Sequence, residues 1–402
     1  MRALQSTWLM AVTPLLGALA PAWAQDAPDL KLNASYAVQS DSNLFRLSAG
    51  ADVNALAGQP SATERIGVTS VGLSLATSQS LQKFEFGASV VDYRYQNFSY
   101  LSFTAANYNA AWRWSVTPRL NGTLSTESRQ ALASFADYQG YTTRNQRTDA
   151  NTRLDTVYEV TGPWRLVAGA TQSSQSNQQA AVAGVDYSST AVDVGVRHVL
   201  SSGSTITYRA KVYNGSYLNR PLNPIGLYDD RFEQTDHDLR MHWALSGKSS
   251  AYLGLTGISR SHPHFAQRDY TGFNTGAGVK WAITGKTGLT ADYAHELSSY
   301  QTSTSSYSQT DRISLGPAWQ ISPKALLSLR HIWSQIDYLG TPALLASSTR
   351  RDTTRDTTLS FSWQPYQALT FSVALQNSVR GSTQAGLDYD STMATLSAQY
   401  SY

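Results

Sequence analysis

The sequence predicts an all-β fold, a transmembrane antiparallel outer-membrane β-barrel of about 18 strands, and three features lead to this prediction. The first is an N-terminal leader of the secretory type. The second is a strict alternation of apolar and polar residues along short segments. The third is a series of turn signals about 40 residues apart, which is the length of two strands with one turn and one loop.

The leader occupies residues 1–24 and has one basic residue, Arg2, before an apolar segment. Small residues at Ala22 and Ala24 fit a cleavage site after Ala24. The apolar segment is shorter than the roughly 20 residues that a membrane-spanning helix needs. We therefore expect residues 1–24 to be a cleaved signal peptide and residues 25–402 to form the barrel.

Residues 311–333 show the alternation most clearly. Ile313 and Leu315 alternate with Arg312 and Ser314, which is the period of a strand with one apolar face. Such a face meets either the core of a soluble sandwich or the lipid around a barrel. The local pattern alone leaves both alternatives open.

Composition favours lipid over a soluble core. Only 15% of the residues are charged, whereas soluble proteins have about a quarter. The chain has no Cys, which excludes disulfides, a lipoprotein anchor and thiolate metal sites. The formal net charge of +3 indicates no general polyanion-binding surface, so the sequence predicts no nucleic-acid partner.

Short turn signals mark the end of the barrel that we expect in the periplasm. Longer polar stretches, such as residues 218–230 and 299–308, are expected outside the cell. We place one strand on each side of every short turn and add terminal strands at residues 30–39 and 387–402. This count gives about 18 strands and places both termini in the periplasm. The short signals are Ser78–Ser80, Thr117–Pro118, Thr161–Pro163, Ser201–Gly203, Ser246–Lys248, Thr284–Lys286, Ser322–Lys324 and Gln364–Pro365.

Aromatic residues mark the expected membrane interfaces. We expect Tyr residues near the long loops, such as Tyr93, Tyr95 and Tyr338, to form an outer girdle rather than to stack on sugars. The Trp residues near the short turns indicate a second girdle at the periplasmic interface. These residues are Trp114, Trp164, Trp281, Trp319 and Trp363.

The chain ends in TLSAQYSY, with Leu396, Ala398, Tyr400 and Tyr402 on one face. This pattern resembles the C-terminal strand that the barrel assembly machinery recognises. The resemblance implies that machinery and the outer-membrane lipids as partners. We expect the protein in the outer membrane of a Gram-negative bacterium.

The same alternation assigns a set of charged residues to the inner wall. A barrel of this size leaves an aqueous passage unless a loop closes it. Charges of opposite sign can pair across neighbouring strands, and a lining with both signs suits a polar solute that makes many weak contacts. The candidates for lining the lumen are Arg113, Arg153, Arg197, Arg209, Lys211, Arg240, Lys280, Asp292, Arg312 and Arg330.

Residues 40–47, SDSNLFRL, follow the first predicted strand. With the leader, the chain length and the repeated strand pattern, they resemble the exosortase-associated barrels of exopolysaccharide biosynthesis, the EpsL-type family. The resemblance implies export or assembly of an extracellular polysaccharide, with separate periplasmic or inner-membrane export components as partners. Without it, SDSN is an Asx-rich turn with a structural role. The alternative function is a general diffusion porin for small hydrophilic solutes.

The sequence predicts no enzyme, cofactor or metal site. No set of Ser, His and acidic residues stands out, and HEL at residues 295–297 lacks the second His of a zinc protease motif. His262 and His264 have a spacing that could ligate a metal, but no cluster of acidic residues lies nearby in the sequence.

Overall fold

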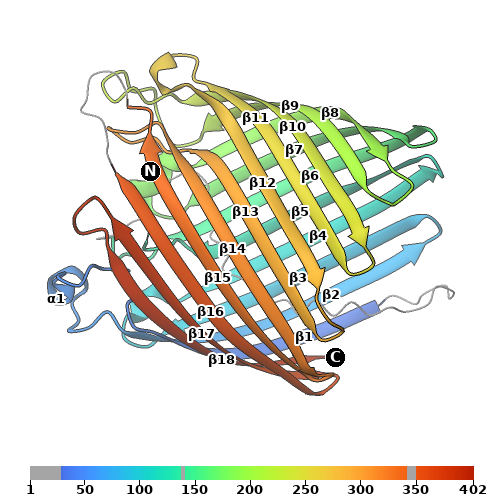
Figure 1. The fold of residues 1–402 in the computed structure, drawn as a ribbon. Coiled ribbons are helices and arrows are strands. Elements are labelled where there is room, and N and C mark those ends of the chain that lie inside the picture. Colours follow the sequence, from blue (N-terminus) through green and yellow to red (C-terminus); the bar gives the residue numbers. More distant parts are fainter. Residues whose placement is uncertain (1–28, 137–140, 342–349) are drawn as a thin grey trace.

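The computed structural model describes residues 29–136, 141–341 and 350–402 and shows a closed antiparallel barrel of 18 strands (Figure 1). Neighbouring strands follow one another in the sequence, and β1 closes the ring by pairing with both β2 and β18. The predicted leader, residues 1–24, lies outside the described residues. The strands are β1 (Asp29–Asp41), β2 (Glu64–Gln79), β3 (Gln82–Tyr95), β4 (Phe103–Thr117), β5 (Leu120–Leu132), β6 (Gln146–Thr161), β7 (Trp164–Asn177), β8 (Tyr187–Val199), β9 (Thr205–Tyr217), β10 (Arg231–Ser246), β11 (Ser249–Ser261), β12 (Tyr270–Ala282), β13 (Thr287–Ser299), β14 (Tyr307–Ser322), β15 (Ala325–Leu339), β16 (Arg351–Tyr366), β17 (Leu369–Ser382) and β18 (Tyr389–Ser401).

Helices are few and short. The described part of the chain has one α-helix, α1 (Val53–Ala57), in the β1–β2 loop. It has three 3-10 turns, η1 (Ser99–Leu101), η2 (Ala180–Val185) and η3 (Ala266–Arg268). Within the residues described, no helix is both long and apolar enough to pass through a bilayer.

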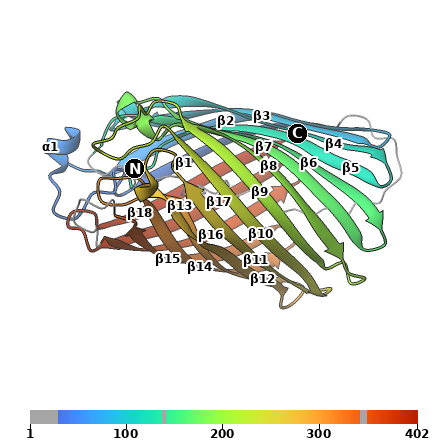
Figure 2. The same cartoon turned by 90° about the horizontal axis from the view of Figure 1, so that it is seen from above.

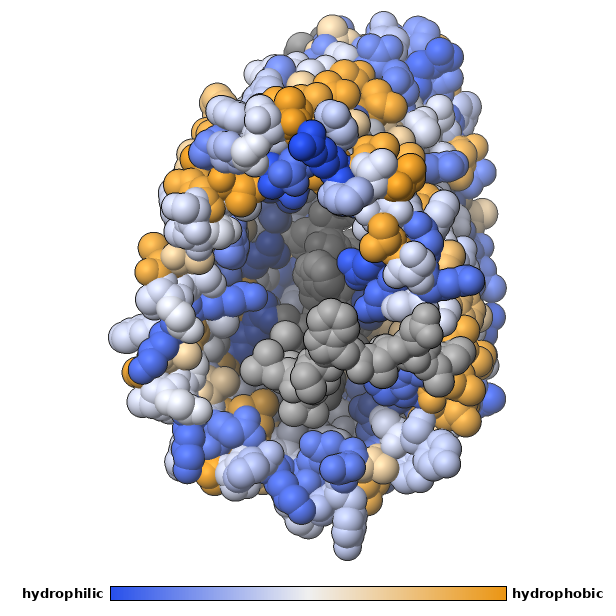
Figure 3. Space-filling view, turned by 90° about the vertical axis from the view of Figure 1, so that its right-hand side faces the viewer, coloured by the Kyte–Doolittle hydropathy of each residue, from blue (hydrophilic) through white to orange (hydrophobic). Residues whose placement is uncertain are grey.

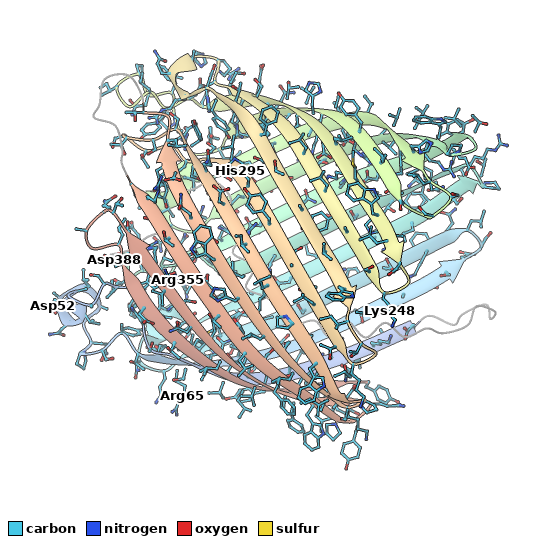
Figure 4. All side chains as sticks on the ribbon, in the orientation of Figure 1. Asp52, Arg65, Lys248, His295, Arg355 and Asp388 are labelled. Atoms are coloured by element: carbon cyan, nitrogen blue, oxygen red, sulfur yellow. The ribbon has the colours of Figure 1, made fainter. Side chains whose placement is uncertain are left out.

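Short turns and long loops lie at opposite ends of the barrel (Figures 1 and 2). Lys248 lies in a short turn at one end, whereas Asp52 and Asp388 lie in loops at the other (Figure 4). Strand β1 begins and β18 ends at the short-turn end, because each is joined to its sequence neighbour by a long loop. The predicted strand number and arrangement of turns and loops are therefore confirmed.

One predicted turn is wrong by a few residues. Gln364 and Pro365 lie inside β16, and the turn itself lies between Tyr366 and Leu369. The register of β16 against β17 shifts between Trp363 and Tyr366. A residue without a backbone N–H is tolerated at such a bulge, so proline does not end the strand here.

The outer wall is apolar, as the alternation predicts. On β14, Ile313, Leu315 and Trp319 are exposed on the outside, whereas Ser314 faces the interior and is buried. Figure 3 looks into the short-turn end and shows a hollow whose rim carries hydrophilic residues, with hydrophobic residues on the outer wall. Near the short turns four of the five predicted girdle residues, Trp164, Trp281, Trp319 and Trp363, are 46–49% exposed, whereas Trp114 is half-buried.

The β1–β2 loop folds back into the long-loop end. Phe45 is 1% exposed and packs edge-on against Phe98, from the β3–β4 loop, and Phe135, from the β5–β6 loop, at ring distances of 4.7 and 4.8 Å. Together with apolar residues on the interior faces of β2, β3 and β4, these rings form a hydrophobic cluster that we call the mouth cluster. Its buried members are Leu44, Phe45, Leu47, Ala62, Ile66, Tyr95, Phe98, Leu101, Phe103, Ala105 and Phe135.

The segment SDSNLFRL, residues 40–47, holds this loop in place. The Asp41 carboxylate accepts hydrogen bonds from Asn43 N (2.9 Å), from the Arg46 guanidinium and from Ser391 Oγ on β18 (2.6 Å). The Asn43 side chain donates to the carbonyl of Leu47 at 2.8 Å and accepts from its amide at 3.0 Å. These contacts give the segment a structural role, which its composition of Asx residues also indicates.

The expected outer Tyr girdle is wrong for most of its proposed members. Tyr95 is buried in the mouth cluster, and Tyr93 packs against it. Tyr338 is 1% exposed, and its hydroxyl donates to Asp352 at 2.9 Å. These rings belong to the packing of the loops inside the mouth, because the strands extend beyond the apolar band and the loops fold over their interior faces.

Replacing Phe45 with Ala tests the mouth cluster. Removing a buried Phe costs roughly 3 to 5 kcal/mol in a packed core, so we expect amide exchange in residues 42–63 to become at least about 100-fold faster. Hydrogen–deuterium exchange by mass spectrometry measures this rate. Leu56→Ala, at an exposed position of α1, is the matched control. Equal exchange in both variants would contradict the packing described.

Candidate functional site

The interior wall is the candidate functional site. Each predicted lumen residue lies on the strand face opposite its outward-facing apolar neighbours. Arg113, for example, follows the exposed Trp112, and Lys280 lies between the exposed Val279 and Trp281. The same face carries Arg153, Arg197, Arg209, Lys211, Arg240, Asp292, Arg312 and Arg330. Their part in solute passage stays a prediction.

Four charged side chains on β6, β8 and β9 form one ion-paired network. Arg153 contacts Asp155 at 2.5 Å and reaches across β7 to Asp193 at 3.1 Å. Arg209 contacts Asp155 at 3.1 Å and also pairs with Asp193, whose side chain is 1% exposed. Each carboxylate therefore has two guanidinium partners, which compensates the cost of burying its charge.

A glycine on the intervening strand makes this network possible. A Cβ atom at Gly169 would lie 2.7 Å from Arg153 Nη2 and 2.7 Å from Asp193 Oδ2. Any larger residue on β7 would therefore push the guanidinium away from Asp193. The sequence shows the Arg and Asp residues, but only the register shows that Gly169 lies beneath their contact.

Two arginines on neighbouring strands face each other directly. Arg165 on β7 pairs in register with Arg197 on β8, and like charges in this position repel. Arg165 contacts Glu159 at 3.2 Å. Arg197 donates to Thr207 Oγ1 at 3.1 Å and has no carboxylate within ion-pair distance among the described residues. Its position leaves uncompensated positive charge on this part of the wall.

The other predicted lumen residues differ in their partners. Arg240 contacts Asp238 at 2.8 Å, and Arg312 contacts Glu296 at 3.1 Å. Arg113 shares Glu85 with Lys83. Lys211 lies 4.3 Å from the centre of the Tyr213 ring, and Asp292 accepts a hydrogen bond from Tyr252 at 3.0 Å. Arg113 and Arg312 thus pair with a carboxylate on a neighbouring strand, as cross-strand neighbours of opposite sign predict, whereas Arg240 pairs within its own strand.

The opposite wall is lined mostly by hydroxyl and amide groups. Strands β15 to β18 and β1 lie about half a turn around the ring from β6 to β10, because strand order follows the sequence. Ser328 and Ser360 share a hydrogen bond at 2.7 Å, and Ser362 and Ser372 share one at 3.0 Å. A solute in the lumen would therefore meet mainly ionic groups on one side and, apart from charges such as Arg330, mainly neutral hydrogen-bonding groups on the other.

The loops on the β9 to β14 side are joined by one buried arginine, which no sequence motif singles out. Arg268, in η3, is 0% exposed. Its guanidinium donates to the carbonyls of Gly226 and Leu227 in the β9–β10 loop, at 2.7 and 3.1 Å. It also donates to Thr302 and Ser305 in the β13–β14 loop, both at 2.7 Å. Three long loops thus share one anchor.

The two histidines of SHPHF have different environments. His262 is 2% exposed and contacts Gln301 at 2.7 Å, and burial, with the nearby Arg260 charge, lowers its pKa to about 4. His264 instead contacts Asp229 at 3.0 Å. Burial raises the pKa of Asp229, but hydrogen bonds from His264 and from Arg231 N outweigh it, and the pKa falls to about 2. The acidic neighbours of His264, absent nearby in the sequence, come from another loop.

Solved barrels share this fold. The outer membrane protein OpdK from Pseudomonas aeruginosa matches with a TM-score of 0.51 and 12% identity over 93% of this chain and 99% of that chain. OccK2 (OpdF) from the same organism, in complex with glucuronate, matches with a TM-score of 0.52 and 11% identity over 93% and 98%. OprD, also from that organism, gives 0.50 and 10% over 93% and 95%.

At these identities the likeness concerns the fold, which is that of an outer-membrane β-barrel. Neither a family model nor a curated protein matches the chain. The resemblance of residues 40–47 to the exosortase-associated EpsL-type barrels therefore stays a prediction.

Replacing Asp193 with Asn tests the ion-paired network. The amide keeps the shape of the carboxylate but removes the charge that Arg153 and Arg209 share. We expect a loss of stability below the roughly 3 to 5 kcal/mol of a fully broken buried pair, because Asp155 still binds both arginines. Urea unfolding in detergent measures it. Asp390→Asn, the same change on the outer wall, should have little effect, and an equal loss in both variants would rule out the network's role.

Proposed function

We propose that this chain is an outer-membrane channel through which small hydrophilic solutes diffuse. The observation that carries the proposal is the lumen itself, a polar interior with a charged wall on β6 to β10 and a hydroxyl wall opposite. The likeness to solved outer membrane proteins supports the same reading over polysaccharide export. No catalytic role is proposed.

The loops at the mouth also favour small solutes over a polymer. The mouth cluster fills the interior beside β2 to β4, and Arg380 on β17 donates to the carbonyl of Ala136, in the β5–β6 loop, at 2.8 Å. This contact ties a loop from one part of the ring to a strand several places away. An extended polysaccharide would have to displace these packed loops, whereas a small solute has only to pass beside them.

The charged wall suggests how solutes are sorted. Arg197 has no ion-pair partner among the described residues, so its guanidinium is available to a carboxylate or another anionic group of a passing solute. Neutral hydroxyl groups on the facing wall would hold the rest of the solute by weak hydrogen bonds. Weak contacts at several positions allow both entry and release.

Liposome swelling tests the proposal. Vesicles that contain the purified barrel should swell in isotonic solutions of a small sugar, whereas vesicles with the heat-denatured protein should not. Swelling should be faster with a sugar acid than with the neutral sugar of the same size, and Arg197→Ala should reduce that difference several-fold. Absence of swelling with any small solute would overturn the channel function.

We further propose that the long loops face the outside of the cell and both chain ends face the periplasm. Residues 223–226 lie in the β9–β10 loop, where Ile225 is 99% exposed. An epitope inserted there should bind antibody on intact cells, whereas one beside Pro323, in a short turn, should bind only after the outer membrane is opened. Labelling at Pro323 alone on intact cells would reverse the orientation.

A further inference from the structure

Two long loops bring three potential metal ligands together at the mouth. Asp229 and Asp230 end the β9–β10 loop, and His264 lies in the β11–β12 loop. His264 Nδ1 is 3.0 Å from Asp229 Oδ1 and 3.9 Å from Asp230 Oδ1. Within the described parts of the chain, this is the group in which three such ligand atoms all lie within 4.8 Å of one another.

The spacing fits a single ion. Nitrogen and oxygen ligands bind zinc at about 2.1 Å, so two ligands at a right angle lie about 3.0 Å apart and two at a tetrahedral angle about 3.4 Å apart. His264 Nδ1 and Asp229 Oδ1 are already 3.0 Å apart, the distance for two ligands at a right angle. Asp230 completes the set by a side-chain rotation, which its 36% exposed side chain can make once it releases its 3.3 Å contact with Arg231 Nε.

The burial of Asp229 is an independent reason to expect a cation. Its side chain is 0% exposed, and among the described residues its one ion-pair partner is His264, itself a ligand in this group, with no Lys or Arg beside it. Its oxygens accept hydrogen bonds from the backbone amides of His264, at 2.7 Å, and Arg231, at 3.3 Å. These amides orient the carboxylate but carry no full charge. Buried carboxylates are usually paired with a cation or bound to a metal.

We propose that Asp229, Asp230 and His264 bind a divalent transition-metal ion, with Zn²⁺ as the representative, and leave its remaining positions to water. One imidazole and two carboxylates suit zinc, cobalt or nickel, whereas calcium and magnesium prefer shells of oxygen alone. The ion takes the place of the hydrogen between His264 Nδ1 and Asp229 Oδ1. Arg231 Nε, now 3.3 Å from Asp230 Oδ1, gives up that contact.

The site lies in the loops at the long-loop end, where a bound ion can link two loops. His264 is 43% exposed at its side chain, so an ion can reach it from the water. Arg268 already joins the β9–β10 and β11–β12 loops to the β13–β14 loop. A bound ion would add a second link between the first two of these loops and make that side of the rim more rigid. This inference does not depend on the proposed channel function.

Metal titration of the untagged, folded barrel tests the proposal. Co²⁺ should produce visible absorption bands that saturate at one ion per chain, Zn²⁺ should displace it, and Ca²⁺ should not. His264→Ala and Asp230→Asn should each weaken Zn²⁺ binding at least about 10-fold. His198→Ala is the matched control, because His198 lies on β8 near the short-turn end, against Trp164. Asp229 is left unchanged because its carboxylate also holds two backbone amides.

Two results would overturn the site. One is Zn²⁺ affinity that stays the same in both His264→Ala and Asp230→Asn while heat-modifiable gel migration shows that the variants are folded. The other is an absence of saturable Co²⁺ absorption in the unmodified barrel up to millimolar concentration. His264→Gln, which keeps a side-chain hydrogen-bond donor for Asp229, separates loss of a ligand from loosening of the loop: it should bind as weakly as His264→Ala.

Discussion

Backbone hydrogen bonding is the constraint on which the rest of this structure depends. Within lipid, each peptide N–H and C=O must find a partner inside the protein, and an open sheet would leave two edges unpaired. Pairing of β1 with β18, from Asn33 opposite Ser401 to Asp41 opposite Met393, removes both edges. Once the ring is closed, each strand has one face toward lipid and one toward the interior, so the side-chain period of two fixes the lining residues.

This constraint explains how much of the fold the sequence could predict. Alternation along a strand is local, so residues such as Ile313 and Arg312 reveal their faces without knowledge of any neighbour. Turn signals are also local, and they located the ends of the strands except where the bulge near Pro365 keeps a proline inside β16. The exposed Trp residues near the short turns can also be predicted, because their distance from a turn is read directly from the sequence.

The parts that could not be predicted depend on contacts between distant segments. Arg268 appears in the sequence as an ordinary loop residue, and its role comes from carbonyls in two other loops. His264 gains its acidic neighbours from another loop, and the nearer one, Asp229, lies 35 positions earlier in the chain. Gly169 matters only because Arg153 and Asp193 meet above it. The buried position of Tyr95 cannot be predicted, because no residue near it in the sequence shows that the β1–β2 loop folds inward.

The anchoring of the β1–β2 loop has a consequence for the order in which the molecule forms. Asp41 and Asn43 bind Ser391 and Asp390 on the last strand, contacts that span 350 and 347 residues of chain. Contacts of such long sequence separation are slow to form, because the entropy of closing the loop is lost before the contact contributes. We therefore expect the contacts between this loop and the last strand to form late. A nascent barrel whose first and last strands have not yet met lacks these anchors, and its β1–β2 loop is held mainly by the mouth cluster.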